Sequence, residues 1–157
     1  MSQEIAEKIK AEFERITNIS CSAKYMKAGS AHEPTNLSRT KSGVYVFLTD
    51  EFCFKVGKAG SKSQARWNSH HYNLDETTPS TLPKSIIKNK SKFKNCFTSE
   101  KHLSIDEINR ENVQSWVKGN LARIEFIIPI QKDKFALNLL EAIAQYELKP
   151  IFEGRNA

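Results

Sequence analysis

Five side chains in this sequence are of the types that could together cleave a phosphodiester. Arg66 would supply a forked, permanently charged donor to a phosphate. Glu141 is the kind of carboxylate that holds Mg²⁺ together with water and phosphate oxygens. Tyr45, aided by Lys55 and His70, could take a proton from the attacking water. These residues predict metal-assisted hydrolysis with Mg²⁺ or Mn²⁺, one ion per active site.

Each of these side chains also has an ordinary structural interpretation. Tyr45 could be a packing aromatic on a strand, while Lys55 and Arg66 could be solvated cations. Other residues of the same types lie nearby, so the choice of His70 as the histidine and of Glu141 as the carboxylate stays open. The competing residues are His71, Glu147 and Glu153.

The strands that would position Tyr45 and Lys55 lie in segment 43–57, GVYVFLTDEFCFKVG. Apolar residues alternate along two runs with turn residues between them, which predicts a β-hairpin. With the turn centred on Asp50, Tyr45 lies directly across from Lys55, with Cβ atoms about 5 Å apart. An ammonium at that distance favours the phenolate form of tyrosine. The opposite face is then wholly apolar and consists of Val44, Val46, Leu48, Phe52, Phe54 and Val56.

A short helix is predicted to carry the arginine and the histidine. Ser61 and Gln64 match a capping box, in which the serine caps the helix and the glutamine reaches back. The pattern predicts a helix over 62–72, and on it Arg66 and His70 share a face because they are four residues apart.

Three further elements complete the expected framework. Helical periodicity predicts an amphipathic helix over 3–17, and the apolar run 121–130 predicts a third strand. A helix over 134–148 follows, with Glu141 on the flank of its buried stripe. That stripe consists of Ala136, Leu137, Leu140, Ile143, Ala144 and Leu148.

The chain resembles the GIY-YIG nuclease family in an ordered set of motifs. These are Gly43-Val44-Tyr45, Lys55-Val56-Gly57, Arg66 with His70 four residues later, and Glu141 within LLEAIAQYELKP. The resemblance covers about residues 43–153 and implies a three-stranded antiparallel sheet flanked by helices. The family usually has Tyr where this chain has Lys55, although restriction-enzyme relatives and members with a Tyr-Lys-Ile-Gly-Lys motif look similar in carrying Lys. Glu153 stands where many relatives have Asn.

The length of 157 residues predicts a single α/β domain. Its parts are an N-terminal helix and loop (1–42), the motif-bearing hairpin and helix (43–72), an insertion (73–120), and the third strand with the Glu-bearing helix (121–157). Short helices are expected in the insertion near 82–88 and after Ser104, where Glu107 completes another capping box. Lysines interleaved with Phe93 and Phe97 predict DNA contact. The candidate contact residues are Lys58, Lys84, Lys88, Lys90, Lys92 and Lys94.

The formal charge of +6 and the isoelectric point near 9.2 favour a polyanionic partner. No apolar run approaches the roughly 20 residues of a membrane helix, so we expect no membrane partner. The three cysteines show no Cys-x-x-Cys spacing and suggest no disulfide set, so we expect a cytoplasmic protein. The sequence thus predicts a DNA endonuclease, with double-stranded DNA favoured and RNA as an alternative substrate. A restriction-type role would suit a homodimer. The alternative function is a noncatalytic nucleic-acid-binding module with the same fold.

Overall fold

A computed structural model describes residues 3–75, 82–97 and 104–152, and its centre is one antiparallel sheet. The sheet has four strands in the order β1 (Ser22–Met26), β4 (Ala122–Pro129), β2 (Lys41–Leu48) and β3 (Cys53–Ala59). The predicted mixed α/β class and antiparallel pairing are confirmed, but the predicted number of three strands is wrong. Strand β1 is short and only partly buried, so it lacks the strong apolar alternation by which strands are recognised.

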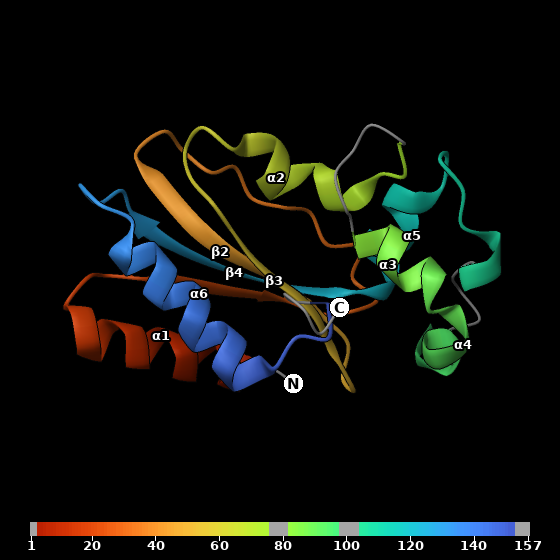
Figure 1. Ribbon diagram of the computed structural model, residues 1–157, viewed down its shortest axis with the longest axis horizontal. Coiled ribbons are helices and arrows are strands. Elements are labelled where there is room, and N and C mark those ends of the chain that lie inside the picture. The colour runs from red at the N-terminus through yellow and green to blue at the C-terminus, as the bar shows by residue number, and fades with distance from the viewer. Residues whose placement is uncertain (1–2, 76–81, 98–103, 153–157) are drawn as a thin grey trace.

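Two long helices cover one face of the sheet. Helix α1 (Gln3–Thr17) and helix α6 (Phe135–Leu148) lie side by side below the strands in Figure 1. Both match their predicted positions to within one residue. Their buried side chains pack on strand residues that face the same way, which gives a core of aliphatic and aromatic groups. This core includes Ile9, Phe13, Val44, Val46, Val56, Phe126, Leu140 and Ala144.

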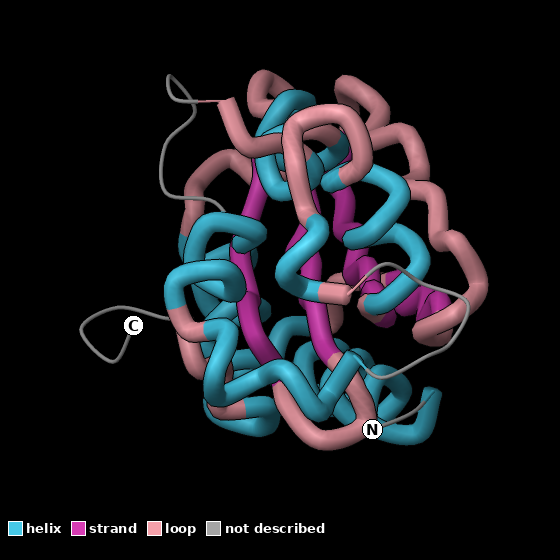
Figure 2. Tube along the Cα trace, turned by 90° about the vertical axis from the view of Figure 1, so that its right-hand side faces the viewer, coloured by secondary structure: helices cyan, strands magenta, loops and turns pink. Residues whose placement is uncertain are grey.

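Short helical segments cover the opposite face. They are α2 (Gln64–Asn68), η1 (His70–Tyr72), α3 (Leu82–Lys88), α4 (Lys90–Phe93), η2 (Lys94–Phe97), η3 (Ile105–Glu107) and α5 (Val113–Asn120). In Figure 1, α2 lies above the strands, whereas α3, α4 and α5 lie at the right-hand end of the molecule, the end that faces the viewer in Figure 2. The helix predicted at 82–88 is confirmed. Ser104 caps nothing with its side chain, so the capping box predicted there is wrong.

The register of the β2–β3 hairpin differs from the predicted one. Tyr45 pairs with Gly57, and Phe47 pairs with Lys55. Lys55 therefore lies diagonal to Tyr45 instead of directly across from it. The phenol ring of Tyr45 lies directly over Gly57. A Cβ at position 57 would therefore collide with the ring. Glycine is required here for close approach of the ring to the backbone.

A β-bulge explains why the turn could not be placed from the sequence. The register shifts between Phe47 and Leu48, after which Leu48 pairs with Cys53. A bulge inserts one extra residue into a ladder, so side chains beyond it exchange faces. Phe54 consequently packs with Tyr45 instead of with the aliphatic face to which it was assigned, whereas Cys53 joins that face.

The helix predicted over 62–72 is interrupted. Helix α2 ends at Asn68, and a separate turn of 3₁₀ helix begins at His70. Ser63 occupies the N-cap position without a side-chain cap, and the Gln64 amide donates to the Leu37 carbonyl, so the predicted capping box is wrong. The buried Trp67 ring fixes α2 against the sheet at Gly43, where a Cβ would lie 2.7 Å from the ring.

Candidate active site

Tyr45 is paired with a histidine beneath helix α2, and that histidine is His71. The distance from Tyr45 Oη to His71 Nε2 is 2.8 Å, and both residues are buried. His71 Nδ1 accepts a long hydrogen bond of 3.4 Å from the Leu82 backbone N–H. Nε2 therefore carries the ring hydrogen and donates to the phenol oxygen. His70 was the predicted partner, but it lies one residue away and is half-buried.

The predicted cations gather around this pair. The pKa of His71 is lowered to about 3, chiefly by burial and in addition by the positive charges of Lys55, Arg123, His70 and Arg66. The imidazole is therefore neutral at physiological pH. Lys55, Arg66 and His70 thus lie close enough to His71 to lower its pKa. Lys55 does not lie opposite Tyr45, although this was predicted.

A fully buried ion pair packs against the ring of Tyr45 and the rings of its neighbours. Arg123 Nε donates to Glu125 Oε2 at 2.9 Å, and neither side chain has any exposed surface. The guanidinium lies over the rings of Tyr45, Phe47 and Trp67, with its carbon 5.0–5.5 Å from their centroids. An uncompensated charge here would cost several kcal/mol, at order of magnitude, so the pair depends on its partners.

Hydrogen bonds from neighbouring segments complete this buried network. His32 Nδ1 donates to the Leu121 carbonyl at 2.8 Å, so His32 Nε2 must accept its 2.8 Å hydrogen bond from the Tyr72 hydroxyl. Tyr72 in turn accepts from Arg123 Nη1 at 3.2 Å. Burial lowers the pKa of His32 to about 4 and raises the pKa of Tyr72. Both groups are neutral in the folded protein.

No member of this buried network was among the residues predicted from the sequence to form the site. Arg123 and Glu125 stand two residues apart within the apolar run 121–130. That spacing places both charges on one face of a strand, so their position could have indicated a buried pair.

Glu141 lies on the other face of the sheet, apart from Tyr45. Its Oε2 atom is 3.7 Å from Lys58 Nζ, and Oε1 accepts from the Gln145 amide at 3.3 Å. Lys58 Nζ also donates to Asn138 Oδ1 at 2.6 Å. Strand β3 is the last strand of the sheet, so Lys58 extends from its edge toward helix α6.

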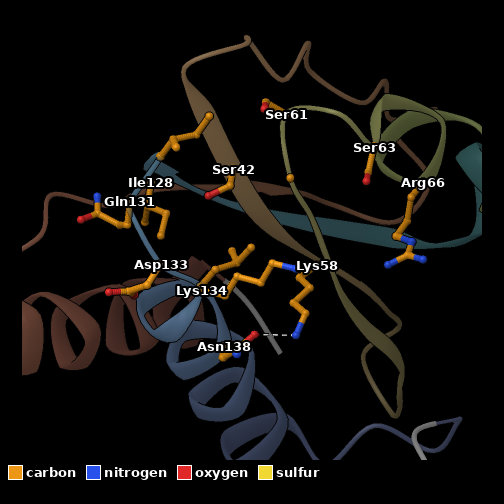
Figure 3. A pocket seen from close by; sticks show the side chains of 13 residues that line it. Ser42, Lys58, Ser61, Ser63, Arg66, Ile128, Gln131, Asp133, Lys134 and Asn138 are labelled. Carbon is orange, nitrogen blue, oxygen red and sulfur yellow. Dashed lines mark hydrogen bonds between the residues drawn. The ribbon is translucent and has the colours of Figure 1, made fainter.

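The residues of the two faces approach each other at one end of β3. A pocket of about 310 Å³ opens there between α2 and α6, and we call it the α2–α6 pocket. Figure 3 shows Arg66 and Lys58 on one side of it and Gln131 and Asp133 on the other. Its polar lining includes Arg66, Lys58, Lys134, Asn138, Ser61 and Ser63. Arg66 and Lys58, both predicted site residues, thus line one pocket, and the lining residue Asn138 stands one turn of α6 before Glu141.

The chemistry of Glu141 fits a single hard cation. Mg²⁺ is commonly held by one or two carboxylates, with waters and substrate phosphates as its remaining ligands. The carboxylate oxygen Oε2 is buried beside the Lys58 ammonium, so a metal ion would replace that ammonium as the local positive charge. Among the described residues, no group of three or more His, Cys, Asp or Glu side chains could hold a metal.

The insertion lysines have three different environments. Lys90 and Lys94 both pair with Asp106, at 3.1 and 3.6 Å, so part of their charge is neutralised within the fold. Lys84 and Lys88, together with Arg110, line a shallow hollow of about 510 Å³. Lys92 lies over the ring of Phe93.

The two aromatic residues of the insertion belong to the core. Phe93 and Phe97 were expected to interleave with the lysines at the surface, but both rings are buried.

Glu153 lies outside the described residues. No described helix combines the length and the apolarity that crossing a bilayer requires.

No family model, curated protein or solved structure matches the chain. The candidate site is therefore defined by its own geometry and chemistry.

Proposed function

We propose that this chain binds the backbone of a nucleic acid in the α2–α6 pocket and hydrolyses a phosphodiester there, as a metal-dependent endonuclease resembling the GIY-YIG family. The observation that carries the proposal is that Arg66 and Lys58 line one pocket, and that Lys58 also pairs with Glu141, which is not itself one of the lining residues. Double-stranded DNA is the favoured substrate.

The pocket has the donors that a phosphate requires. Arg66 is exposed and offers a planar fork that matches two phosphate oxygens, whereas Lys58 supplies a compact charge. The Ser61 and Ser63 side chains in the lining add hydroxyl donors. Because these groups come from β3, α2 and the segment between them, they are fixed relative to one another by the sheet.

Glu141 would hold the ion, which when bound supplies positive charge at the scissile phosphate and orients the attacking water. Lys58 has a part in this step because its ammonium must leave Glu141 when a cation arrives. A phosphate in the pocket would give that ammonium a new partner. Arg66 would then stabilise the charge that develops on the phosphoryl oxygens.

The buried environment of Tyr45 favours a second candidate function, that of a noncatalytic nucleic-acid-binding module. Its side chain is 2% exposed, and His71 donates to its oxygen instead of accepting its proton. A general base must reach the water that it deprotonates. In this second function Tyr45 and His71 are packing residues, and the α2–α6 pocket binds phosphate without cutting.

Cleavage of supercoiled plasmid at low salt with Mg²⁺ separates the two functions. The variants are Arg66→Ala, Glu141→Gln and Tyr45→Phe, with Glu147→Gln as a matched control. Glu147 lies on the same helix but is paired with Lys8 at 2.9 Å. DNA affinity is measured in parallel in a chelator, so that loss of binding is not mistaken for loss of chemistry.

For an endonuclease, we expect cutting that requires the metal, disappears in Glu141→Gln and persists in Glu147→Gln. Arg66→Ala should slow cutting by about 100-fold or more. Binding that depends on Arg66, without cutting in Mg²⁺ or Mn²⁺, would establish the noncatalytic module instead. Wild-type protein that binds neither DNA nor RNA at low salt would refute both functions.

A further inference from the structure

The first turn of helix α6 presents an aromatic ring that the fold does not use. Phe135 is 79% exposed, the highest value among the large hydrophobic side chains of the described residues. Its backbone N–H donates to Asp133 Oδ1 at 2.9 Å, which fixes the start of the helix and therefore the base of the side chain. An exposed phenyl ring on a rigid element is a contact surface without an internal partner.

The ring borders a hollow between helix α6 and the end of helix α1. This Phe135 hollow has a volume of about 520 Å³. Apolar residues make up half of its lining, and Lys132 and Asp133 are its charged members. The apolar side chains that line it are Ile19, Phe135, Ala136 and Leu139. A flat aromatic group would find an apolar surface here and a cation next to it.

The Phe135 hollow adjoins the α2–α6 pocket. Gln131 and Asp133 line both, so the two cavities lie on either side of the turn between β4 and α6. In Figure 3 these two side chains lie on the side of the α2–α6 pocket opposite Arg66. Lys134 lines the pocket, and Lys132 lines the hollow. A positively charged cavity and an apolar cavity thus meet at a shared wall.

We propose that the Phe135 hollow binds an unpaired base of the nucleic acid strand whose phosphate lies in the α2–α6 pocket. The inference rests on the proposed function, because it takes the phosphate site from it. Aromatic rings beside a positively charged groove are the usual means of holding a single strand. Inside a duplex both faces of a base are covered by its neighbours, so a ring stacks far more readily on an unpaired base.

The occupant is a nucleotide and not an apolar protein surface because of the charges at the rim. Lys132 lines the hollow, and Lys58, Arg66 and Lys134 line the adjoining pocket, against the single acid Asp133 that lines both. This excess of positive charge attracts a phosphate backbone. The proposal adds a substrate class to the site: nucleic acid with at least one unpaired base next to the bound phosphate, such as an overhang, a flap or a single strand.

The test is equilibrium binding by fluorescence anisotropy, in a chelator, to a labelled single strand of about 12 nucleotides and to a blunt duplex of the same sequence. Phe135→Ala is compared with Tyr146→Ala, because Tyr146 is 74% exposed on the same helix but borders no hollow described above. We expect Phe135→Ala to weaken single-strand binding by about tenfold and to leave duplex binding unchanged. Tyr146→Ala should affect neither.

Single strands with one abasic position then locate the stacked base. At that position, loss of the base should weaken binding to the wild type but not to Phe135→Ala, because the two changes remove the same contact.

Three results would overturn the inference. The first is wild-type affinity of Phe135→Ala for the single strand, and the second is an equal loss on the duplex. The third is reduced self-association of Phe135→Ala with unchanged DNA binding, which would assign the hollow to a second copy of this chain.

If binding needs Lys58 and Arg66 but not Phe135, the inference fails while the phosphate site stands. If binding needs none of the three, the proposed function fails as well.

Discussion

The two buried histidines predict that this protein loses stability in mild acid. Burial holds the pKa of His71 at about 3 and the pKa of His32 at about 4, whereas an unfolded histidine titrates near 6.5. Because both folded pKa values are depressed, the unfolded chain binds more protons than the folded one below pH 6.5. The stabilisation is therefore complete above that pH and is lost as the pH falls from 6.5 toward 4.

The magnitude follows from the same values. At pH 5, each histidine should lower the free energy of unfolding by about 2 kcal/mol relative to pH 8. Together they should remove about 4 kcal/mol, a large part of the roughly 5–15 kcal/mol that stabilises an ordinary domain. The carboxyl groups of Glu12 and Asp106 have pKa values below their ordinary range, so they titrate at lower pH and do not obscure this window.

Urea unfolding followed by circular dichroism between pH 8 and pH 5 measures the effect. The variants His32→Gln and His71→Gln should each be less stable at pH 8, and each should show about 2 kcal/mol less dependence on pH than the wild type. A free energy of unfolding that stays constant from pH 7 to pH 5 would refute the reasoning. So would an unchanged pH dependence in His71→Gln.

Two further perturbations test the packing around Tyr45. Glu125→Leu should lower the free energy of unfolding by about 3–5 kcal/mol, whereas the double variant with Arg123→Met should lose less, since no unpaired charge is left buried. Urea unfolding of the single and double variants would contradict this if their losses simply added. Gly57→Ala should cost about 1–3 kcal/mol by forcing the Tyr45 ring away, and thermal unfolding should show a smaller cost in a Tyr45→Ala background.

Long periodic elements were predictable from the sequence because their burial pattern is a local property. Helices α1 and α6 carry their apolar stripes in consecutive turns, and each was placed to within one residue. The β2–β3 hairpin was also predicted, but its register was not. The bulge after Phe47 depends on how the strand packs on both faces, which no local alternation encodes.

The site was only partly predictable for a related reason. Motif order gave Tyr45, Arg66 and Glu141 as candidates, but it could not show that Tyr45 and Glu141 lie on opposite faces of the sheet. Nor could it choose between His70 and His71, because the break between α2 and η1 turns the second imidazole inward. The break follows from tertiary packing of Trp67 and Tyr72, and the sequence alone shows only an unbroken polar helix pattern.

The position of the first strand has a consequence for synthesis on the ribosome. Strand β1 pairs with β4, so Ser22 lies opposite Ile127, and Lys8 of α1 meets Glu147 of α6 across 139 residues. The β2–β3 hairpin can form as soon as it emerges, but β1 must wait for β4, and α1 must wait for α6. During that interval the apolar face of α1 lacks its contact with α6, and it is a segment that a chaperone would need to shield.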